Sequence, residues 1–304
     1  MAEQKPYTVL PPMQQQLRCL TEDEIRNFKF YGCVLVEDSF LPQEVKLLQT
    51  MAEEVLDMRS GSGVTQAFEQ VPMNTEDHTV MSSGSEKVYQ QRLCRVEGFI
   101  PRHTGFTAIA RDRLAPLAAQ LLGEECHLFK EKLNIKHANG GVGYAAHFDG
   151  PSAASVGLAE RFVTAQLAID DNTLENGTLQ VVMPRCACPW FDDEKNEEEC
   201  AATVMVQPTD ADPDAGGRVG AIMPEVAASL DWQAVPCQAG SVLLFDGFFP
   251  HRSAPNYSDG PRKTAYFLFN GDSDGGDCHN TYKQVMAAAR RAAAAKATVP
   301  TPAM

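Results

Sequence analysis

Apolar residues follow a helical period in the first part of the chain and a strand period in the second. Thr21 and Glu24 are spaced as a capping box, which predicts a helix that begins there and ends at Gly32. Further along, apolar residues from Val45 to Val55 recur every three or four positions. Helices are therefore expected over residues 21–32, 42–58 and 105–122.

From about residue 126 the pattern changes to short β-rich segments separated by Gly, Pro, Asn and Asp, the residues that favour turns. Strands are expected over residues 128–136, 141–147, 162–169, 178–183, 241–245 and 263–269, with an earlier one over 33–36. Many short strands with turn signals between them are typical of a β-sandwich or a β-barrel. Because the helices come first, we expect an all-β core with flanking helices on one face.

The chain has 304 residues, a length that one helix-covered β-barrel can fill. We therefore expect a single domain over residues 1–304. Its parts are a helical part over about 20–125, a barrel core over about 126–270, an irregular insertion over about 186–235 and a C-terminal helix over about 279–297. Residues 1–20 are expected to form a loose arm, and the polar stretch 59–87 an irregular excursion.

The composition narrows the possible partners. Lys and Arg number 26 and Asp and Glu 40, so the net charge is −14 and the pI is near 4.9. Such a surface repels nucleic acid and anionic membranes, so an anionic substrate must be bound by basic groups gathered inside a pocket. No stretch approaches the roughly 18 apolar residues of a membrane helix, and nine scattered cysteines without a CxxC pair are typical of free thiols. We expect a cytoplasmic location. The sequence does not indicate which oligomeric state the protein has.

The segment Tyr144–Gly150 carries the sharpest chemical motif of the chain. His147 and Asp149 are two residues apart, and residues at this spacing on a strand project to the same side. An imidazole and a carboxylate placed in this way are two of the three ligands in the 2-His-1-carboxylate set, which leaves iron positions open for oxygen chemistry. A lone His-x-Asp also occurs by chance, as a structural histidine beside a solvated aspartate.

A second group of polar residues lies far downstream. His251 supplies a third ligand from a distant strand, and Arg262 follows eleven residues later, where the next strand of a hairpin brings it back beside the metal. A guanidinium there binds a carboxylate through two parallel hydrogen bonds, as the far end of a dicarboxylic co-substrate requires. Arg262 alone is more typical of a surface salt bridge, but the four residues in this order favour the metal and co-substrate site. A closed structural zinc site is disfavoured, because two histidines and one aspartate leave a position open.

These motifs resemble those of the phytanoyl-CoA dioxygenase superfamily. The resemblance runs from LTEDEIRNFKFYGCVLVED to about residue 285 and is most specific in GYAAHFD, AQLAIDDNTLENGTLQVV and PHRSAPNYSDGPRKTAYFLFN. It implies a double-stranded β-helix (jelly-roll, cupin-like) barrel that uses Fe(II), 2-oxoglutarate as co-substrate and O2. Carried over by position, it implies that His147, Asp149 and His251 hold the iron as the catalytic centre.

The resemblance also implies a set of residues around the co-substrate. Arg262 would hold the distal carboxylate of 2-oxoglutarate, with Ser253 assisting. Lys132 and Gln166 match positions whose side chains border that co-substrate. Arg95 falls in RLCRVEGF, where the superfamily places another basic contact.

Within the superfamily, LFKEKLNIKHANGG and LCRVEGF are most similar to the bacterial 2-aminoethylphosphonate dioxygenases. On a β-strand, the polar residues at alternate positions share one face: Lys130, Lys132, Asn134 and Lys136. That face is either solvated or, as the resemblance favours, turned to the barrel interior, where Lys132 and Asn134 neutralise an anionic ligand. Lys136 either meets an internal carboxylate such as Glu97 or awaits a ligand anion. Asn134, Lys136 and Tyr144 are the candidates for substrate contact.

The residues and the resemblance together predict an Fe(II)/2-oxoglutarate-dependent dioxygenase that hydroxylates a small molecule, with an anionic aminoalkylphosphonate as the expected substrate. Halogenation is disfavoured, because halogenating relatives have Ala or Gly in place of the carboxylate ligand and Asp149 is present. Two alternatives stay open: a non-catalytic binding or regulatory protein of the same fold, and an oxidase of a natural-product intermediate. Trp190 and Phe191, at the start of the insertion, either cap the substrate or anchor the loop.

Overall fold

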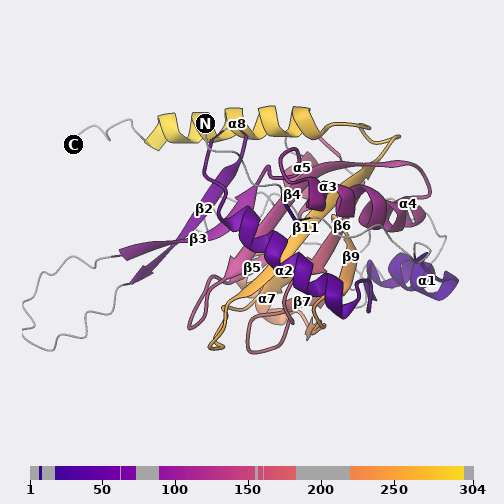
Figure 1. Ribbon diagram of the computed structural model, residues 1–304, viewed down its shortest axis with the longest axis horizontal. Helices are drawn as coiled ribbons and strands as arrows, with labels where there is room; N and C mark the ends of the chain where they lie inside the picture. Colours follow the sequence, from indigo (N-terminus) through magenta and orange to yellow (C-terminus); the bar gives the residue numbers. More distant parts are fainter. Residues whose placement is uncertain are drawn as a thin grey trace, which may run out of the picture.

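The computed structural model describes residues 7–8, 18–61, 63–72, 89–154, 157–159, 161–182 and 220–297. Its strands form two antiparallel sheets (Figure 1). The larger sheet consists, in spatial order, of β1 (Cys33–Val36), β9 (Val242–Asp246), β6 (Phe162–Ala168), β11 (Arg262–Gly271), β4 (Cys126–Lys136), β3 (Tyr89–Glu97) and β2 (Thr65–Pro72). The smaller consists of β5 (Tyr144–His147), β10 (His251–Ser253), β7 (Leu179–Val182) and β8 (Trp232–Ala234).

Apolar side chains of the two sheets pack against one another. Leu243 and Phe245 of β9 form one buried cluster with Leu179 and Val181 of β7, joined by Phe249. The sheets therefore face each other and enclose an interior. The predicted all-β core with flanking helices is confirmed, while closure into a barrel and the single-domain organisation stay predictions.

Helices cover the outer face of the larger sheet, as Figure 1 shows for α2 and α4. The helices are α1 (Glu22–Tyr31), α2 (Pro42–Leu56), α3 (Thr104–Ile109), the π-helix η1 (Ala110–Leu114), α4 (Ala115–Leu122), α5 (Gly150–Ala154), α7 (Pro224–Ser229) and α8 (His279–Ala297). The expected capping box of α1 is present, because Glu24 N donates to Thr21 Oγ1 over 3.2 Å and Thr21 N donates to Glu24 Oε2 over 2.8 Å. Gly32 ends this helix with a left-handed φ of 78°.

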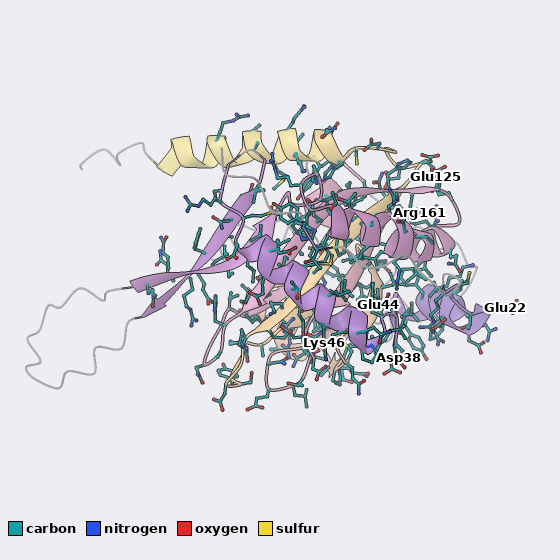
Figure 2. The ribbon with its side chains drawn as sticks, viewed as in Figure 1. Glu22, Asp38, Glu44, Lys46, Glu125 and Arg161 are labelled. Carbon is teal, nitrogen blue, oxygen red and sulfur yellow. The ribbon has the colours of Figure 1, made fainter. Side chains whose placement is uncertain are left out.

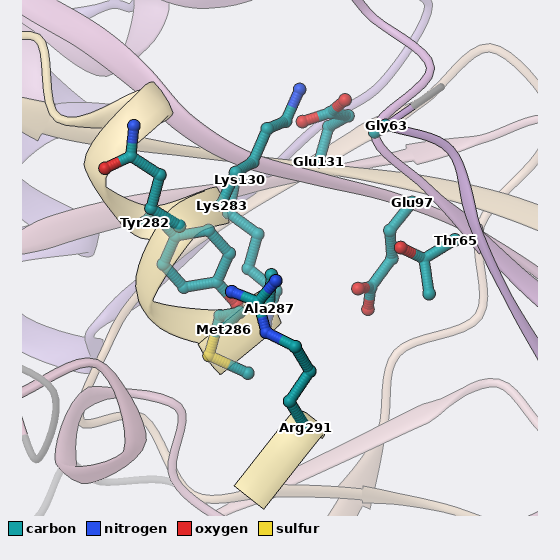
Figure 3. Close-up of a pocket in the computed structure, with 12 residues that line it drawn as sticks. Gly63, Thr65, Glu97, Lys130, Glu131, Tyr282, Lys283, Met286, Ala287 and Arg291 are labelled. Atoms are coloured by element: carbon teal, nitrogen blue, oxygen red, sulfur yellow. The ribbon is translucent and has the colours of Figure 1, made fainter. Parts of the chain in front are cut away.

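The C-terminal helix α8 packs against β4 at the end of the larger sheet. Tyr282 is buried, with its ring centroid 5.8 Å from that of Phe129, and His279 Nε2 lies 3.1 Å from Glu131 Oε2. A cavity of about 330 Å³ lies between α8 and the strands β3 and β4 (Figure 3). The helix α8 thus coincides with the expected range 279–297, and one of its faces is part of the packed structure.

Within the described residues, ordered structure is present in three segments that were expected to be irregular. Residues 65–72, expected in an excursion, form β2, which pairs along its length with β3. The expected loose arm is anchored at Thr8, whose amide and hydroxyl both donate to the Glu54 carboxylate. The end of the expected insertion, from residue 220, contains α7 and β8. Trp190 and Phe191 lie outside the described residues.

Charged side chains such as Glu22, Lys46 and Glu125 lie on the outside of the molecule (Figure 2). Glu44 is an exception, because its side chain is buried and forms a 2.5 Å ion pair with Arg113. Among the residues that the structure describes, no helix has the length and hydrophobicity that a membrane span requires.

We expect Phe267→Ala to lower the free energy of unfolding by about 3–5 kcal/mol, the usual result of truncating a buried Phe. Phe267 is fully buried between the larger sheet and its helices, with its ring centroid 6.1 Å from that of Phe106. Denaturant unfolding measures the loss. Phe30→Ala is the matched control, because Phe30 is 62% exposed and its truncation should cost less than about 0.5 kcal/mol. Equal losses in the two variants would contradict the assigned core.

Candidate metal centre

Three predicted ligands meet between the two sheets. His147 ends β5, and His251 begins the neighbouring strand β10, where the two histidines are paired in register. Asp149 follows β5, and its Oδ1 and Oδ2 lie 3.8 Å from Nε2 of His147 and of His251 respectively. One ligand atom from each residue lies within 4.8 Å of the others, and all three side chains are buried. The structure therefore brings the whole predicted triad together.

Backbone carbonyls fix the orientation of both imidazole rings. His147 Nδ1 lies 2.7 Å from Ala145 O, and His251 Nδ1 lies 2.9 Å from Phe249 O. Because a carbonyl oxygen only accepts, each Nδ1 carries the proton and donates it, which leaves the Nε2 lone pair toward the centre. Two such nitrogens beside one carboxylate fit a divalent cation with open positions, as in 2-His-1-carboxylate iron sites.

The inner face of the larger sheet is polar and buried. Lys132, Asn134 and Lys136 of β4 are between 2% and 6% exposed, so the solvated-face interpretation is wrong for these three residues. Alternate residues point the other way, and Leu133 packs in the core under the helices. Across β11 the same inner face continues through Arg262, which pairs in register with Lys136.

Two cations meet at one carbonyl at the end of this face. Lys136 Nζ donates to Gly177 O over 3.1 Å and to Ser253 Oγ over 2.9 Å. Arg262 Nη2 donates to the same Gly177 oxygen over 2.9 Å. No carboxylate of the described residues forms an ion pair with either cation, so the expected alternative of a Lys136–Glu97 contact is wrong. Burial and the neighbouring Arg262 lower the pKa of Lys136 to about 7.

Two residues of this cluster were missed from the sequence. Gly177 has a φ of 73°, and a Cβ there would lie 2.2 Å from Ala254 O and 2.9 Å from Lys136 Nζ, so the approach of the lysine requires glycine. Thr264 accepts from Arg262 Nη1 over 2.5 Å. Its place two residues after Arg262, on the same strand face, is the signal that could have identified it.

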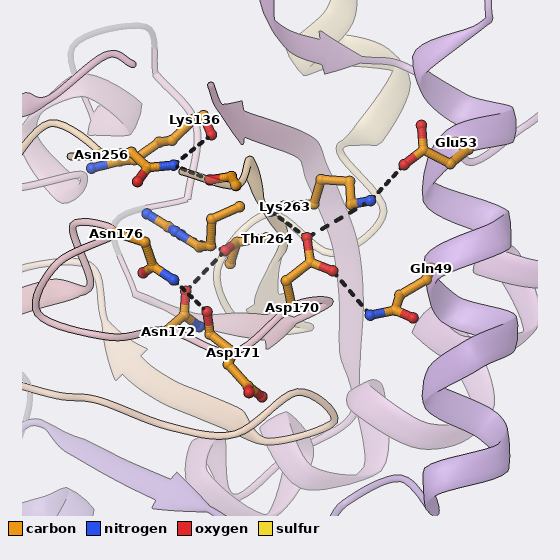
Figure 4. A network of polar contacts seen from close by, with 12 residues as sticks. Gln49, Glu53, Lys136, Asp170, Asp171, Asn172, Asn176, Asn256, Lys263 and Thr264 are labelled. Carbon is orange, nitrogen blue, oxygen red and sulfur yellow. Dashed lines mark hydrogen bonds and ion pairs between the residues drawn. The ribbon is translucent and has the colours of Figure 1, made fainter. Parts of the chain in front are cut away.

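A polar network holds the first residues of β11 in place (Figure 4). Lys263 points away from the interior, where its Nζ lies 2.5 Å from Glu53 Oε1 of α2, and its amide donates to Asp170 Oδ2 over 2.9 Å. On the other side, Asn256 Nδ2 donates to Lys136 O over 3.1 Å. The Lys263 contacts fix the backbone next to Arg262, and the bonds to Thr264 and Gly177 hold its guanidinium.

Arg95, Asn134 and Tyr144 form a neighbouring group. Arg95 Nε donates to Asn134 Oδ1 over 3.0 Å, and its guanidinium carbon lies 5.4 Å from the Tyr144 ring centroid. Glu97 lies 3.6 Å from Arg95 Nη1. The remaining predicted residue, Gln166, is 2% exposed and lies on β6 in register with Tyr266.

Some buried polar atoms on the inner faces lack hydrogen-bond partners among the described residues. They include Gln166 Oε1, Thr164 Oγ1 and Arg262 Nε. Buried polar groups without partners are rare, since each costs about 1–3 kcal/mol. Their concentration between the sheets is typical of a ligand site, and Thr164 is a residue that the sequence pattern did not single out.

Comparison with known sequences gives one family. The sequence profile described as Phytanoyl-CoA dioxygenase (PhyH) matches residues 28–264. The chain is 32% identical over 187 residues to a 2-aminoethylphosphonate dioxygenase from the uncultured bacterium HF130_AEPn_1, covering 61% of this chain and 62% of that protein. It is 31% identical over 185 residues to a methylphosphonate hydroxylase from Gimesia maris, covering 60% and 61%. The matched part thus spans 62% of the length of the first relative.

Solved structures show the same fold. EctD from S. alaskensis, crystallised with 2-oxoglutarate and 5-hydroxyectoine, aligns with a TM-score of 0.56 at 20% identity, over 90% of this chain and 86% of that one. The non-heme alpha ketoglutarate dependent epimerase SnoN from nogalamycin biosynthesis aligns with a TM-score of 0.55 at 21% identity, over 82% of each chain.

Proposed function

Because the chain belongs to the phytanoyl-CoA dioxygenase (PhyH) family, we propose that it is an Fe(II)- and 2-oxoglutarate-dependent dioxygenase that hydroxylates a small anionic molecule. One observation carries this proposal: a buried His-Asp-His triad lies beside two buried cations that have no carboxylate partner among the described residues. Ser253 joins the two sites, since it accepts from Lys136 and lies two residues after His251. Two residues of a strand span about 7 Å.

His147, Asp149 and His251 are the residues that would hold the iron, which when bound supplies the redox chemistry that couples O2 and 2-oxoglutarate to substrate hydroxylation. The chain itself contributes ligand orientation through the Ala145 and Phe249 carbonyls. Burial of all three side chains excludes bulk water from the centre.

Arg262, Lys136 and Ser253 would bind the distal carboxylate of 2-oxoglutarate. A carboxylate here gains a guanidinium, an ammonium and a hydroxyl, and replaces the Gly177 carbonyl as the partner of both cations. Gln166 and Lys132 border the same interior and would contact the rest of the co-substrate.

The substrate proposed is an aminoalkylphosphonate or a close analogue. One line of support is the similarity to a 2-aminoethylphosphonate dioxygenase and a methylphosphonate hydroxylase. The other is the basic interior of this acidic protein, in which Arg95, Asn134 and Tyr144 are grouped. We further propose that the two sheets are the halves of a double-stranded β-helix, that residues 1–304 form one domain, and that the protein acts in the cytoplasm without nucleic acid or membrane partners.

Anaerobic addition of Fe(II) and 2-oxoglutarate to the protein is expected to produce a weak visible charge-transfer band. On exposure to O2 with 2-aminoethylphosphonate, we expect succinate and hydroxylated product to appear in equal amounts. Absorption spectroscopy and mass spectrometry measure the two results. Absence of both the charge-transfer band and succinate would favour a non-catalytic binding protein. Succinate release only with neutral natural-product compounds would favour an oxidase of a natural-product intermediate.

A further inference from the structure

The cavity between α8 and the strands β3 and β4 is lined by charged groups of both signs (Figure 3). These are the basic side chains of Lys130, Lys283 and Arg291 and the carboxylates of Glu97 and Glu131. In Figure 3 Glu97 lies across the cavity from α8. A volume of about 330 Å³ lies at the lower end of the range for small-molecule sites.

Both carboxylates already have partners in the protein. Glu131 Oε1 accepts from Ile100 N over 3.0 Å, and its Oε2 lies 3.1 Å from His279 Nε2. Glu97 Oε1 lies 3.6 Å from Arg95 Nη1. Both carboxylates are thus held by groups at the edge of the cavity, and the lining as a whole carries three basic groups and two carboxylates.

The three basic groups have no such partners. No carboxylate within the described ranges forms an ion pair with Lys130, Lys283 or Arg291. Lys130 Nζ lies 5.4 Å from the Tyr282 ring centroid. Burial acts to lower the pKa of Lys130, yet neighbouring groups raise it above its ordinary value, so the ammonium stays charged. The lining therefore has an excess of one basic group.

One wall of the cavity packs against the segment that follows Asp149, because Tyr282 lines the cavity and belongs to one buried cluster with Ala153 of α5. Phe245, Thr164, Leu268 and Lys130 form one row across β9, β6, β11 and β4, and the His251 ring lies 5.1 Å from the Phe245 ring. Lys136 is six residues from Lys130 on β4, about 20 Å along the strand. Lys130 thus lies at the other end of the inner face from the Lys136 and Arg262 cations.

We propose that this cavity binds the phosphonate group of the substrate, with Lys130 as the central contact and α8 as one wall. A doubly charged tetrahedral oxyanion matches three basic groups that form no ion pair within the described residues, and the position leaves the Arg262 end for 2-oxoglutarate. The inference rests on the proposed function. It adds α8 as a determinant of substrate specificity, and this helix begins after residue 264, where the match to the family profile ends.

The test is calorimetric titration of 2-aminoethylphosphonate into the full chain loaded anaerobically with Fe(II) and 2-oxoglutarate. Lys130→Met keeps the aliphatic stem against Tyr282 and removes the charge, so we expect the Kd to rise about tenfold or more. Arg291→Gln, at an exposed position, should raise it about threefold. The matched control is Lys46→Gln on α2, exposed and labelled in Figure 2, which should leave the Kd unchanged.

Each variant is also titrated with 2-oxoglutarate, whose Kd should stay unchanged and thereby report an intact fold. Inorganic phosphate should compete with 2-aminoethylphosphonate in the wild type. Unchanged phosphonate affinity in Lys130→Met, no binding of phosphonate or phosphate by the wild type, or phosphate binding without competition would each overturn the assignment. Failure of the wild type to bind 2-oxoglutarate with Fe(II) would instead refute the proposed function.

Discussion

Replacing Asp149 with alanine is expected to abolish 2-oxoglutarate turnover, with a loss of succinate release greater than about 100-fold. Changes in residues that merely support metal ligands cost 10–100-fold, and Asp149 provides the only carboxylate of the triad. The variant should also lose the visible band of the Fe(II)–2-oxoglutarate complex. Asp259→Ala is the matched control, because Asp259 is an exposed aspartate, and its turnover should equal that of the wild type.

The same variant separates an iron site from a structural metal site. Asp149 is buried between two imidazoles, so a metal that held the fold together would make Asp149→Ala unfold at a much lower temperature. If the metal site is open and catalytic, Asp149→Ala and the wild type should melt at nearly the same temperature, because the larger sheet and its helices form the main core. Full activity in Asp149→Ala would refute the metal assignment altogether.

Most strands that form the interior were predictable because each carries its own pattern, whereas β3, β8 and β10 lay outside the expected ranges. In β4, polar residues alternate with Leu133 and Ile135, and turn residues bound the neighbouring strands, so the ends of the predicted strands differ from the observed ones by at most three residues. In β2, by contrast, the segment Thr65–Pro72 contains few apolar residues and is stabilised by hydrogen bonds to β3. Such a strand forms because it pairs with a strand that is distant in sequence, so its own residues do not predict it.

In the candidate site, too, some residues were predictable from a local pattern and others were not. His147 and Asp149 share a strand spacing, so a local pattern sufficed to find them. The convergence of Lys136 and Arg262 on the Gly177 carbonyl depends instead on how three separate segments are placed in space. Sequence reasoning therefore identified the charged side chains, while their neutral partners, and the fact that Glu97 lies beside Arg95, required coordinates.

Replacing Arg262 with lysine is expected to raise the Kd for 2-oxoglutarate at least tenfold, and the apparent KM with it. Lysine keeps the charge, but it cannot donate two parallel hydrogen bonds and does not reach Gly177 O and Thr264 Oγ1 together. Anaerobic titration with Fe(II) measures the Kd. Arg26→Lys, on the exposed part of α1, is the control and should bind like the wild type. An unchanged Kd would move the carboxylate contact to Lys132 or Arg95.

The pH dependence of the same Kd tests whether Lys136 shares this carboxylate. Without ligand, burial and Arg262 hold the pKa of Lys136 at about 7, and a bound carboxylate raises it. Binding therefore takes up a proton above pH 7, so wild-type affinity should fall as the pH rises from about 7 toward the raised pKa. Lys136→Met should bind 2-oxoglutarate more weakly below pH 7 and lose this pH dependence, whereas Arg262→Lys should retain it. A pH dependence that persists in Lys136→Met would show that another group titrates, and Lys136 would then serve the fold through Ser253 and Gly177 alone.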